Sequence, residues 1–266
     1  MNAIPMSDEL HFAVEVSRAA GNLLMRYYGR VIDYQIRELK GVLTKADLES
    51  DEYIREQIDL HYPDHDILSE ELEEKSQNGE YTWIVDPLDG TTNFLKGNPL
   101  FSVSVGLAQR GRPVLGVVYN PYNNELFCAE TGKGAHLNEQ KIGVSAAASL
   151  AQAIVCLGAN FSDPTGQQRG RQLLARLTPP VSFRVRLNES TALSLCYVAA
   201  GRFDAFVDPD VNPWDVAAGG LIVQEAGGTM RDYAGRPWDP FAAGVIASNG
   251  RLHDELAALL RDEGRG

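Results

Sequence analysis

Two aspartates, Asp86 and Asp89, lie in the segment WIVDPLDGTTNF, where an apolar run meets a glycine and two threonines. The Trp-Ile-Val run predicts a buried strand, Pro87 stiffens the backbone after it, and Gly90 permits a tight turn. Two carboxylates and the neighbouring hydroxyl of Thr91 are ligands for a hard cation such as Mg²⁺, which often shares its other positions with phosphate oxygens. DP and DG are also ordinary turn formers, so this segment alone fits a metal site and a plain turn equally well.

Three further acids could join this pair. Glu70 ends the strand-like run ILSEE, Asp215 begins the apolar helix WDVAAGGLIVQEAGG, and Asp47 lies near the start of another predicted helix. Each also has a plain interpretation, because Glu70 opens a surface charge run and acids near helix starts interact with the helix dipole. No His or Cys cluster competes, so the set suits oxygen-ligated metals rather than zinc. Paired divalent ions can activate water for an in-line phosphoryl displacement, and the sequence therefore indicates phosphate monoester hydrolysis.

The sequence predicts layered α/β structure for the helices and strands that must position these acids. Apolar periodicity predicts helices over 7–29 and 48–61, and short apolar runs predict strands over 101–109, 113–120 and 126–130. We expect an antiparallel sheet in this part of the chain. From 154 onwards the pattern alternates, with strands over 154–160, 181–187, 203–208 and 244–249 and helices over 165–177, 190–201, 214–226 and 252–263.

A stretch of small residues over 144–153 indicates a boundary. We therefore expect an N-terminal half over 1–145, carrying DPLDGTTN, and a C-terminal half over 146–266, carrying WDVAAGG, in one compact catalytic unit. The loop over 30–43 contains Gly41, which fits either a segment that closes over the site or an ordinary turn.

Charge and composition exclude several classes of protein. The chain has 266 residues, with 24 Lys and Arg against 36 Asp and Glu and a net charge of −12. This balance disfavours nucleic acid and anionic membranes, and it would repel a phosphorylated substrate unless bound cations reverse the local sign. Three widely spaced cysteines predict reduced core residues. The N-terminus lacks the features of a signal peptide and no stretch is long and apolar enough to span a bilayer, so we expect a cytoplasmic protein.

Several segments in order resemble the inositol monophosphatase family of lithium-sensitive, Mg²⁺-dependent phosphatases. WIVDPLDGTTNF is similar to the first family signature and WDVAAGGLIVQEAGG to the second, while GKGAHLN and TALSLCYVAAGRFDAF, which lie between them, also resemble family segments. The resemblance covers roughly residues 10–255. It implies an αβαβα sandwich with an antiparallel N-terminal sheet and a mixed C-terminal sheet, usually a homodimer, with two or three Mg²⁺ ions between the halves.

The resemblance also implies a role for each site residue. The metal ligands would be Glu70, Asp86, the backbone carbonyl of Leu88, Asp89 and Asp215. Thr91 and Glu70 would activate the attacking water, with Asp47 near the threonine or a further metal. Backbone amides of Gly90 and Thr91 would hold phosphate oxygens. The alcohol portion of the substrate would contact Asp89, Glu189, Ser190, Thr191 and Asp208.

One departure from the family pattern bears on the substrate. Glu189 stands where many relatives carry glycine, next to the expected position of the substrate. Its carboxylate could accept hydrogen bonds from sugar hydroxyls, favour a substrate with a cationic group such as histidinol phosphate, or pair with Arg184 or Arg186.

The leading hypothesis is a Mg²⁺-dependent phosphatase for small soluble phosphate monoesters, with inositol 1-phosphate as the first substrate to test. Fructose 1,6-bisphosphate, histidinol phosphate and nucleotide 3′-phosphates are alternatives within the same chemistry. A non-catalytic regulator that retains the fold is an alternative of a different class, and it predicts loss of the ligands or of Thr91. The sequence retains all of them.

Overall fold

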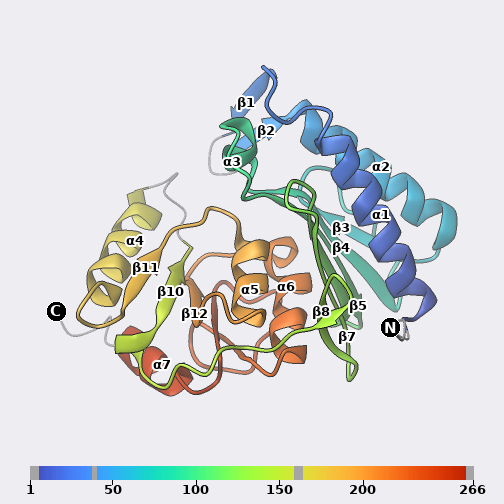
Figure 1. Cartoon of the computed structure of the whole chain (residues 1–266). Helices are drawn as coiled ribbons and strands as arrows, with labels where there is room; N and C mark the ends of the chain where they lie inside the picture. Colours follow the sequence, from blue (N-terminus) through green and yellow to red (C-terminus); the bar gives the residue numbers. More distant parts are fainter. Residues whose placement is uncertain (1–5, 38–40, 159–163, 262–266) are drawn as a thin grey trace.

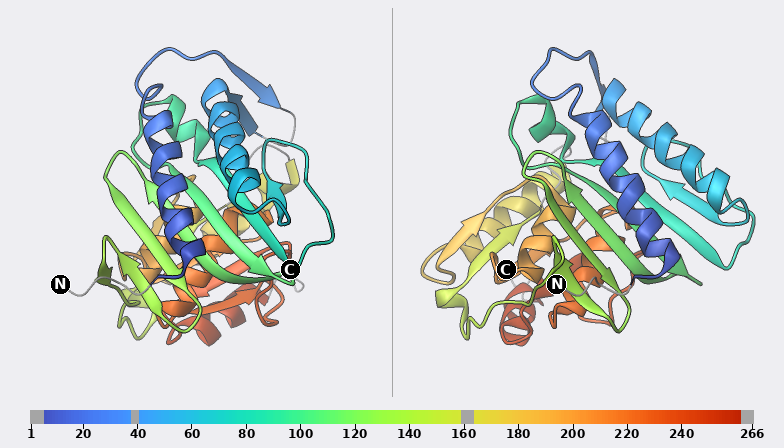
Figure 2. Two further views of the ribbon diagram at one scale, coloured as in Figure 1. Left: turned by 90° about the vertical axis from the view of Figure 1, so that its right-hand side faces the viewer. Right: turned by 45° about the vertical axis from the view of Figure 1, so that its right-hand side comes forward.

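The structure is a computed structural model that describes residues 6–37, 41–158 and 164–261. Within these residues, helices and two large sheets alternate in five layers (Figure 1). Helices α1 and α2 cover one face of a seven-stranded sheet, α5 and α6 lie between the two sheets, and α4 and α7 cover the far face of a five-stranded sheet (Figures 1 and 2). The predicted αβαβα sandwich is confirmed.

The outer helices of the first half follow the apolar periodicity of the sequence. Helix α1 (Asp8–Leu24) begins after Ser7, whose Oγ accepts a hydrogen bond from the Leu10 amide at 3.2 Å. It ends five residues before the predicted limit at Gly29. Helix α2 (Lys45–His61) begins three residues earlier than predicted, because Thr44 caps it. Both helices bury one apolar face on the sheet, where the core includes Trp83 and Phe101.

The seven-stranded sheet carries the first group of acids. Its strands lie in the order β3 (Asp66–Ser69), β4 (Tyr81–Asp89), β5 (Ser102–Gln109), β6 (Arg112–Asn120), β7 (Glu125–Glu130), β8 (Gly134–Leu137) and β9 (Gln140–Lys141). The antiparallel prediction holds for every neighbouring pair except β3 and β4, which run parallel. Residues 70–80 connect the end of β3 to the start of β4 at the opposite end of the sheet, as a parallel pair requires.

The five-stranded sheet is mixed, as predicted. Its order is β11 (Arg184–Arg186), β10 (Ile154–Leu157), β12 (Ala205–Asp208), β14 (Val245–Ser248) and β13 (Thr229–Asp232). The first three strands are parallel, and β14 is antiparallel to both of its neighbours. Its helices are α4 (Pro164–Leu177), α5 (Thr191–Ala199), α6 (Pro213–Glu225) and α7 (His253–Arg261), with a short 3₁₀ turn, η1 (Leu150–Gln152), before β10.

Helix α6 joins the two halves. It is buried from Val216 to Val223 and packs against β4, β5, β6 and β7 on one side and β13 and β14 on the other. Such a helix reads as apolar all round because both of its sides are covered. At the closest approach, a Cβ at Gly116 of β6 would lie 2.7 Å from the Ala218 backbone, so only glycine fits there. The segment 142–149 between β9 and η1 contains the 145/146 division, which we propose as the boundary between the halves.

Three elements near the site are absent from the sequence prediction. Strands β1 (Tyr34–Arg37) and β2 (Gly41–Thr44) form an antiparallel hairpin that begins in the expected loop over 30–43 and ends one residue beyond it. The short helix α3 (Thr91–Leu95) follows the aspartate motif directly. Residues 38–40 of the expected loop, 159–160 of the expected strand and 262–263 of the expected last helix lie outside the described residues.

Candidate metal centre

A β-bulge determines how Asp86 and Asp89 face. Strand β4 continues through both residues rather than ending before them, and its partners in β5 are Ser104 and Ser102. Three steps along β4 therefore match two steps along β5, so one extra residue is inserted at Pro87 and Leu88. Without the insertion, residues three apart would point to opposite faces of the sheet. The bulge puts both carboxylates on the same face, and Pro87, which lacks an amide hydrogen, is suited to it.

Asp89 links the two halves of the molecule. Its Oδ2 accepts hydrogen bonds from Ser102 Oγ at 2.9 Å and from Ser190 Oγ, and its Oδ1 accepts from the Thr191 amide at 3.0 Å. Ser190 and Thr191 belong to the start of α5, so this buried carboxylate holds that helix against β4 and β5. The sequence analysis did not include Ser102, although serines at alternate positions of the apolar run FSVSV were a signal for it.

Asp47 and Thr91 form a hydrogen-bonded pair beside the bulge. Thr44 and Asp47 make a reciprocal capping box at the start of α2, in which Asp47 Oδ2 accepts from the Thr44 amide at 2.8 Å. The other oxygen, Oδ1, lies 3.0 Å from the Thr91 hydroxyl, which is also 3.0 Å from the Leu88 carbonyl oxygen. Asp47 therefore stabilises the helix start and orients Thr91 at the same time.

Gly90 makes the turn between the bulge and α3. Its φ of +85° lies in the left-handed region, and a Cβ would lie 2.8 Å from the Leu100 carbonyl oxygen. Glycine is therefore required by backbone conformation and by space. The turn brings Thr91 back beside Leu88 and Asp47.

Glu70 and Glu71 follow strand β3 at the same edge. The Glu70 amide donates to the Val85 carbonyl, which ties Glu70 to β4 just before the bulge. The sequence analysis treated the following charge run as surface, but the Glu71 side chain is only 1% exposed and forms a two-pronged ion pair with Arg37 of β1. Arg37 was not among the predicted residues, because nothing in its local sequence indicates that the hairpin reaches this corner.

The second half contributes Asp215 and Asp208. Asp215 lies in the first turn of α6, where its Oδ2 accepts from the Asn212 amide at 2.7 Å. Asp208 ends β12; its carboxylate is buried, accepts from the Asp210 amide at 3.1 Å and points towards Gly158. Asp215 thus caps the start of α6, as an acid in a first helical turn often does. Its charge also raises the pKa of Glu70 and Asp86 in the first half.

Burial and mutual repulsion raise the pKa values of acids in both halves. Burial, followed by the charges of Asp215, Glu71 and Asp47, raises the pKa of Glu70 well above its usual value, while Arg37 lowers it. Burial and the neighbouring carboxylates Glu70, Asp89 and Asp215 raise the pKa of Asp86 in the same way.

The same repulsion reaches the groups at the edge of the cluster. Burial raises the pKa of Asp215 to about 7, with Asp89 adding to the effect. Burial also raises the pKa of Asp47 to about 6 against the hydrogen bonds from Thr44. Carboxylates gathered this closely are stable in the ionised form only when positive charge is brought to them.

The donor set fits a hard divalent cation. It consists of carboxylate and carbonyl oxygens, it has a strong excess of negative charge, and Asp86 and Asp89 are buried while Glu70 and Asp215 are partly exposed. Among the described residues, however, no three Asp, Glu, His or Cys side chains are close enough to enclose an ion as they stand. A cation bound here would therefore require these side chains to turn inward. The individual ligand assignments remain predictions.

Glu189 lies at the rim of this site, immediately before Ser190 and Thr191. Its φ is +52°, its side chain is exposed, and its carbonyl oxygen lies 3.3 Å from the Cβ position of Gly90. The structure shows no ion pair of Glu189 with Arg184 or Arg186 within the described residues. Instead, the Arg184 guanidinium stacks on Phe183, 4.3 Å from the ring centroid.

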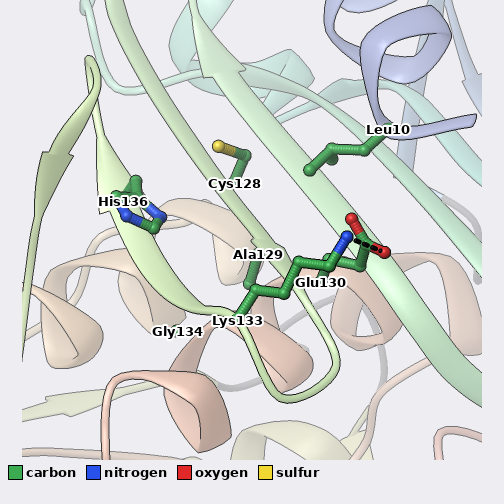
Figure 3. A pocket seen from close by; sticks show the side chains of 7 residues that line it. All are labelled: Leu10, Cys128, Ala129, Glu130, Lys133, Gly134 and His136. Carbon is green, nitrogen blue, oxygen red and sulfur yellow. Dashed lines mark ion pairs between the residues drawn. The ribbon is translucent and has the colours of Figure 1, made fainter. Parts of the chain in front are cut away.

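The small hollow at α1 and the three cysteines, elsewhere in the described residues, do not form an alternative catalytic site. A hollow of about 10 Å³ lies between α1 and the β7–β8 turn. It has room for about one water, and the Lys133–Glu130 ion pair of 2.7 Å lies beside it (Figure 3). Cys128, which lines it, is a free and buried thiol like Cys156 and Cys196, as predicted, and burial raises the pKa of Cys128 to about 11. Among the described residues, no helix is long and apolar enough to cross a membrane.

Comparison with known proteins defines the class of protein to which this fold and site belong. The sequence model of the inositol monophosphatase family matches residues 6–265, and the chain belongs to this family. The predicted resemblance is confirmed over nearly the whole chain.

Particular relatives carry two kinds of name. The chain is 39% identical over 257 residues to the fructose-1,6-bisphosphatase/inositol-1-monophosphatase of Thermotoga maritima, with 96% of each chain covered. It is 36% identical over 261 residues to the Nus factor SuhB of Escherichia coli K12, with 97% of each covered. Among solved structures, the extragenic suppressor protein suhB of Bartonella henselae superposes with a TM-score of 0.91 at 34% identity, covering 97% of this chain and 100% of that one.

Proposed function

We propose that the protein is a Mg²⁺-dependent phosphatase that hydrolyses small soluble phosphate monoesters, with inositol 1-phosphate as its preferred substrate. The observation that carries this proposal is the set of acids from both halves: Asp215 of α6 acts on Glu70 and Asp86 of the first half, and Asp47 lies 3.0 Å from the Thr91 hydroxyl beside the bulge that carries Asp86 and Asp89. Membership of the inositol monophosphatase family supports the phosphatase class, and the metal ions, their number and the substrate belong to the proposal.

In this proposal, Glu70, Asp86, Asp89, Asp215 and the Leu88 carbonyl would hold two or three Mg²⁺ ions. When bound, Mg²⁺ supplies positive charge that polarises the phosphoryl group and favours ionisation of the attacking water. The protein contributes a rigid bulge that fixes two of the acids and a network of hydrogen bonds that keeps them on one face.

Thr91 has the geometry to orient the attacking water. Its single hydroxyl proton points to Asp47 Oδ1 or to the Leu88 carbonyl, each 3.0 Å away, so its oxygen lone pairs remain to accept a hydrogen from water. Burial and the neighbouring carboxylates disfavour the charged form of Glu70, which suits this side chain to take up that proton. The amides of Gly90 and Thr91, at the start of α3, would hold phosphate oxygens, and Asp89, Glu189, Ser190, Thr191 and Asp208 would contact the alcohol portion.

Fructose 1,6-bisphosphate is a second candidate substrate. A hollow of about 360 Å³ begins at Pro209, next to Asp208, and Arg169 and Arg236 line it. Arginines are the side chains that best bind a second phosphate group, and here Arg236 also forms an ion pair with Asp232 in the same hollow. The Thermotoga maritima relative carries both activities in its name, which supports this choice.

The test is a panel of substrates with and without Mg²⁺. Phosphate release is measured from inositol 1-phosphate, fructose 1,6-bisphosphate, histidinol phosphate and a nucleotide 3′-phosphate. We expect Mg²⁺-dependent release with inositol 1-phosphate highest in kcat/KM, and lithium inhibition as a secondary expectation. Replacing Arg169 and Arg236 with alanine should raise KM for fructose 1,6-bisphosphate alone. Absence of release from all four substrates in saturating Mg²⁺ would favour the regulatory function that the name Nus factor gives to the Escherichia coli relative.

A further inference from the structure

The β1–β2 hairpin meets the metal-site acids through one side chain. Three of the four residues of β1 are exposed, among them Tyr34 and Ile36, whereas the last, Arg37, is largely covered. Strand β2 continues into Thr44, which caps α2 and binds Asp47. In Figure 1 the hairpin projects beyond the large sheet, beside α3. A projecting hairpin with an exposed first strand requires a specific anchor to stay in place.

Arg37 makes a two-pronged contact with Glu71. Its Nη1 lies 2.5 Å from Glu71 Oε2 and its Nη2 lies 3.0 Å from Glu71 Oε1, the parallel geometry that a guanidinium and a carboxylate favour. The Glu71 side chain is 1% exposed, so its charge is removed from water and Arg37 is its neutralising partner. Opening the hairpin would leave that carboxylate buried and unpaired, which is strongly unfavourable.

The same guanidinium reaches Glu70. Its Nη2 lies 4.0 Å from Glu70 Oε1, and its buried Nε has no hydrogen-bond partner among the described residues. Arg37 therefore lies beside two carboxylates, and neutralising Glu71 alone does not explain its position next to Glu70.

We propose that Arg37 is a positioning residue that clamps the β1–β2 hairpin onto the Glu70–Glu71 corner and holds the Glu70 carboxylate ready for Mg²⁺ and for the attacking water. Arg37 acts through Glu70 and touches neither substrate nor metal in this account. The effect on turnover rests on the proposed phosphatase function, whereas the clamp itself does not.

A second ion pair of the same geometry provides the control. Arg202 and Glu125 also form a two-pronged contact, with atom pairs at 2.5 and 3.0 Å, and Arg202 further contacts the rings of Phe127 and Tyr197. This pair joins β7 to the turn after α5. Removing Arg202 breaks an ion pair of the same geometry, although a more exposed one, and leaves the charge beside Glu70 unchanged.

The experiment compares Arg37→Ala, Arg37→Lys, Glu71→Gln and Arg202→Ala in the full chain. Mg²⁺ affinity is measured by calorimetry, hairpin protection by amide hydrogen exchange of residues 41–44, and kcat at saturating Mg²⁺. For Arg37→Ala we expect Mg²⁺ affinity and kcat each to fall about 10- to 100-fold, as when a partner that orients a ligand is removed. The hairpin amides should exchange at least about 10-fold faster. Arg37→Lys, which keeps the charge and loses the fork, should lie between Arg37→Ala and the unsubstituted protein.

The remaining variants separate positioning from general stability. Glu71→Gln should reproduce the faster hairpin exchange, and the double variant with Arg37→Ala should be no worse than Arg37→Ala alone, because both break one contact. Arg202→Ala should lower thermal stability and leave Mg²⁺ affinity and hairpin exchange unchanged. If Arg37→Ala lowers only the melting temperature, with Mg²⁺ affinity and hairpin exchange unaltered, the clamp is wrong. If the unsubstituted protein hydrolyses no phosphate ester, the proposed function fails, and calorimetry and exchange still decide on the clamp.

Discussion

The β4 bulge and the start of α6 both present acids to the site, but they are held in different ways. Asp89 in the bulge is buried and receives hydrogen bonds from β5 and α5, so its position depends on contacts that are distant in sequence. Asp215 is partly exposed and is held by Asn212, three residues before it. The bulge region is therefore fixed by tertiary packing, whereas the α6 acid is fixed by local helix capping. Substitutions should affect stability in the first region and charge balance in the second.

The largest expected effect comes from Asp89→Asn. Turnover should fall by about 10³-fold or more, on the scale known for removing one preorganised electrostatic group. The melting temperature should fall as well. The NH₂ group of asparagine would replace an oxygen that accepts hydrogen bonds, so at least one donor among Ser102, Ser190 and Thr191 would lose its partner. Kinetics and thermal denaturation in the same buffer measure both. Full activity with Mg²⁺ present would remove Asp89 from the mechanism.

Asp215→Asn should separate catalysis from stability. We expect a comparable loss of turnover, but an unchanged or higher melting temperature in Mg²⁺-free buffer, because the substitution removes a charge from a repelling cluster and an amide oxygen can still accept from Asn212. A melting temperature that falls as far as that of Asp89→Asn would contradict the comparison between the two regions.

Thr91→Ala and Asp47→Asn test the hydrogen-bonded pair beside the bulge. Each should lower kcat by about 10²-fold, since each removes a group that orients the attacking water. The two share the contact of 3.0 Å, so the double variant should be little worse than either single one. Multiplied losses in the double variant would show that the two residues act independently.

The sequence was sufficient to predict the parts of this site that are determined locally. Asp215 at a helix start and Trp83 in a buried strand follow from periodicity and from the position of an acid at a helix end. The bulge at Pro87 and Leu88 could not be predicted, because the extra residue is defined only by the pairing of β4 with Ser102 and Ser104 of β5. Likewise, the contact of Arg37 with Glu71 depends on how the hairpin folds back, and no local pattern encodes it.

Mg²⁺ binding and a rise in pH should affect stability in opposite ways. The pKa of Asp47 is raised to about 6 and that of Asp215 to about 7, so in Mg²⁺-free buffer the folded state binds more protons than the unfolded chain between pH of about 4 and 7. Stability should therefore decrease as pH rises through that range. Melting temperatures in chelator at pH of about 5 and 8 should differ by several degrees, and saturating Mg²⁺ should reduce or reverse the difference. A metal-free protein that is more stable at the higher pH would contradict the assignment of a repelling acid cluster.

The smallest expected effect concerns the packing that brings the two regions together. Gly116→Ala should destabilise the fold by about 1–3 kcal/mol, because its Cβ would lie 2.7 Å from the Ala218 backbone in α6. Gly106→Ala, on the paired position of β5, is the control; its Cβ would lie 3.4 Å from the nearest atom, an ordinary contact. Thermal denaturation of both variants measures the difference. Equal melting temperatures would show that the close approach of α6 does not limit how the halves pack.

The most direct test of the central claim, that acids from both halves bind the same Mg²⁺ ions, is a Mg²⁺-binding isotherm for the unsubstituted protein and for Asp215→Asn. We expect the substitution, made in the second half alone, to weaken Mg²⁺ binding by at least about 10-fold. Unchanged Mg²⁺ affinity in Asp215→Asn would show that the second half does not contribute to the metal site and would contradict the account.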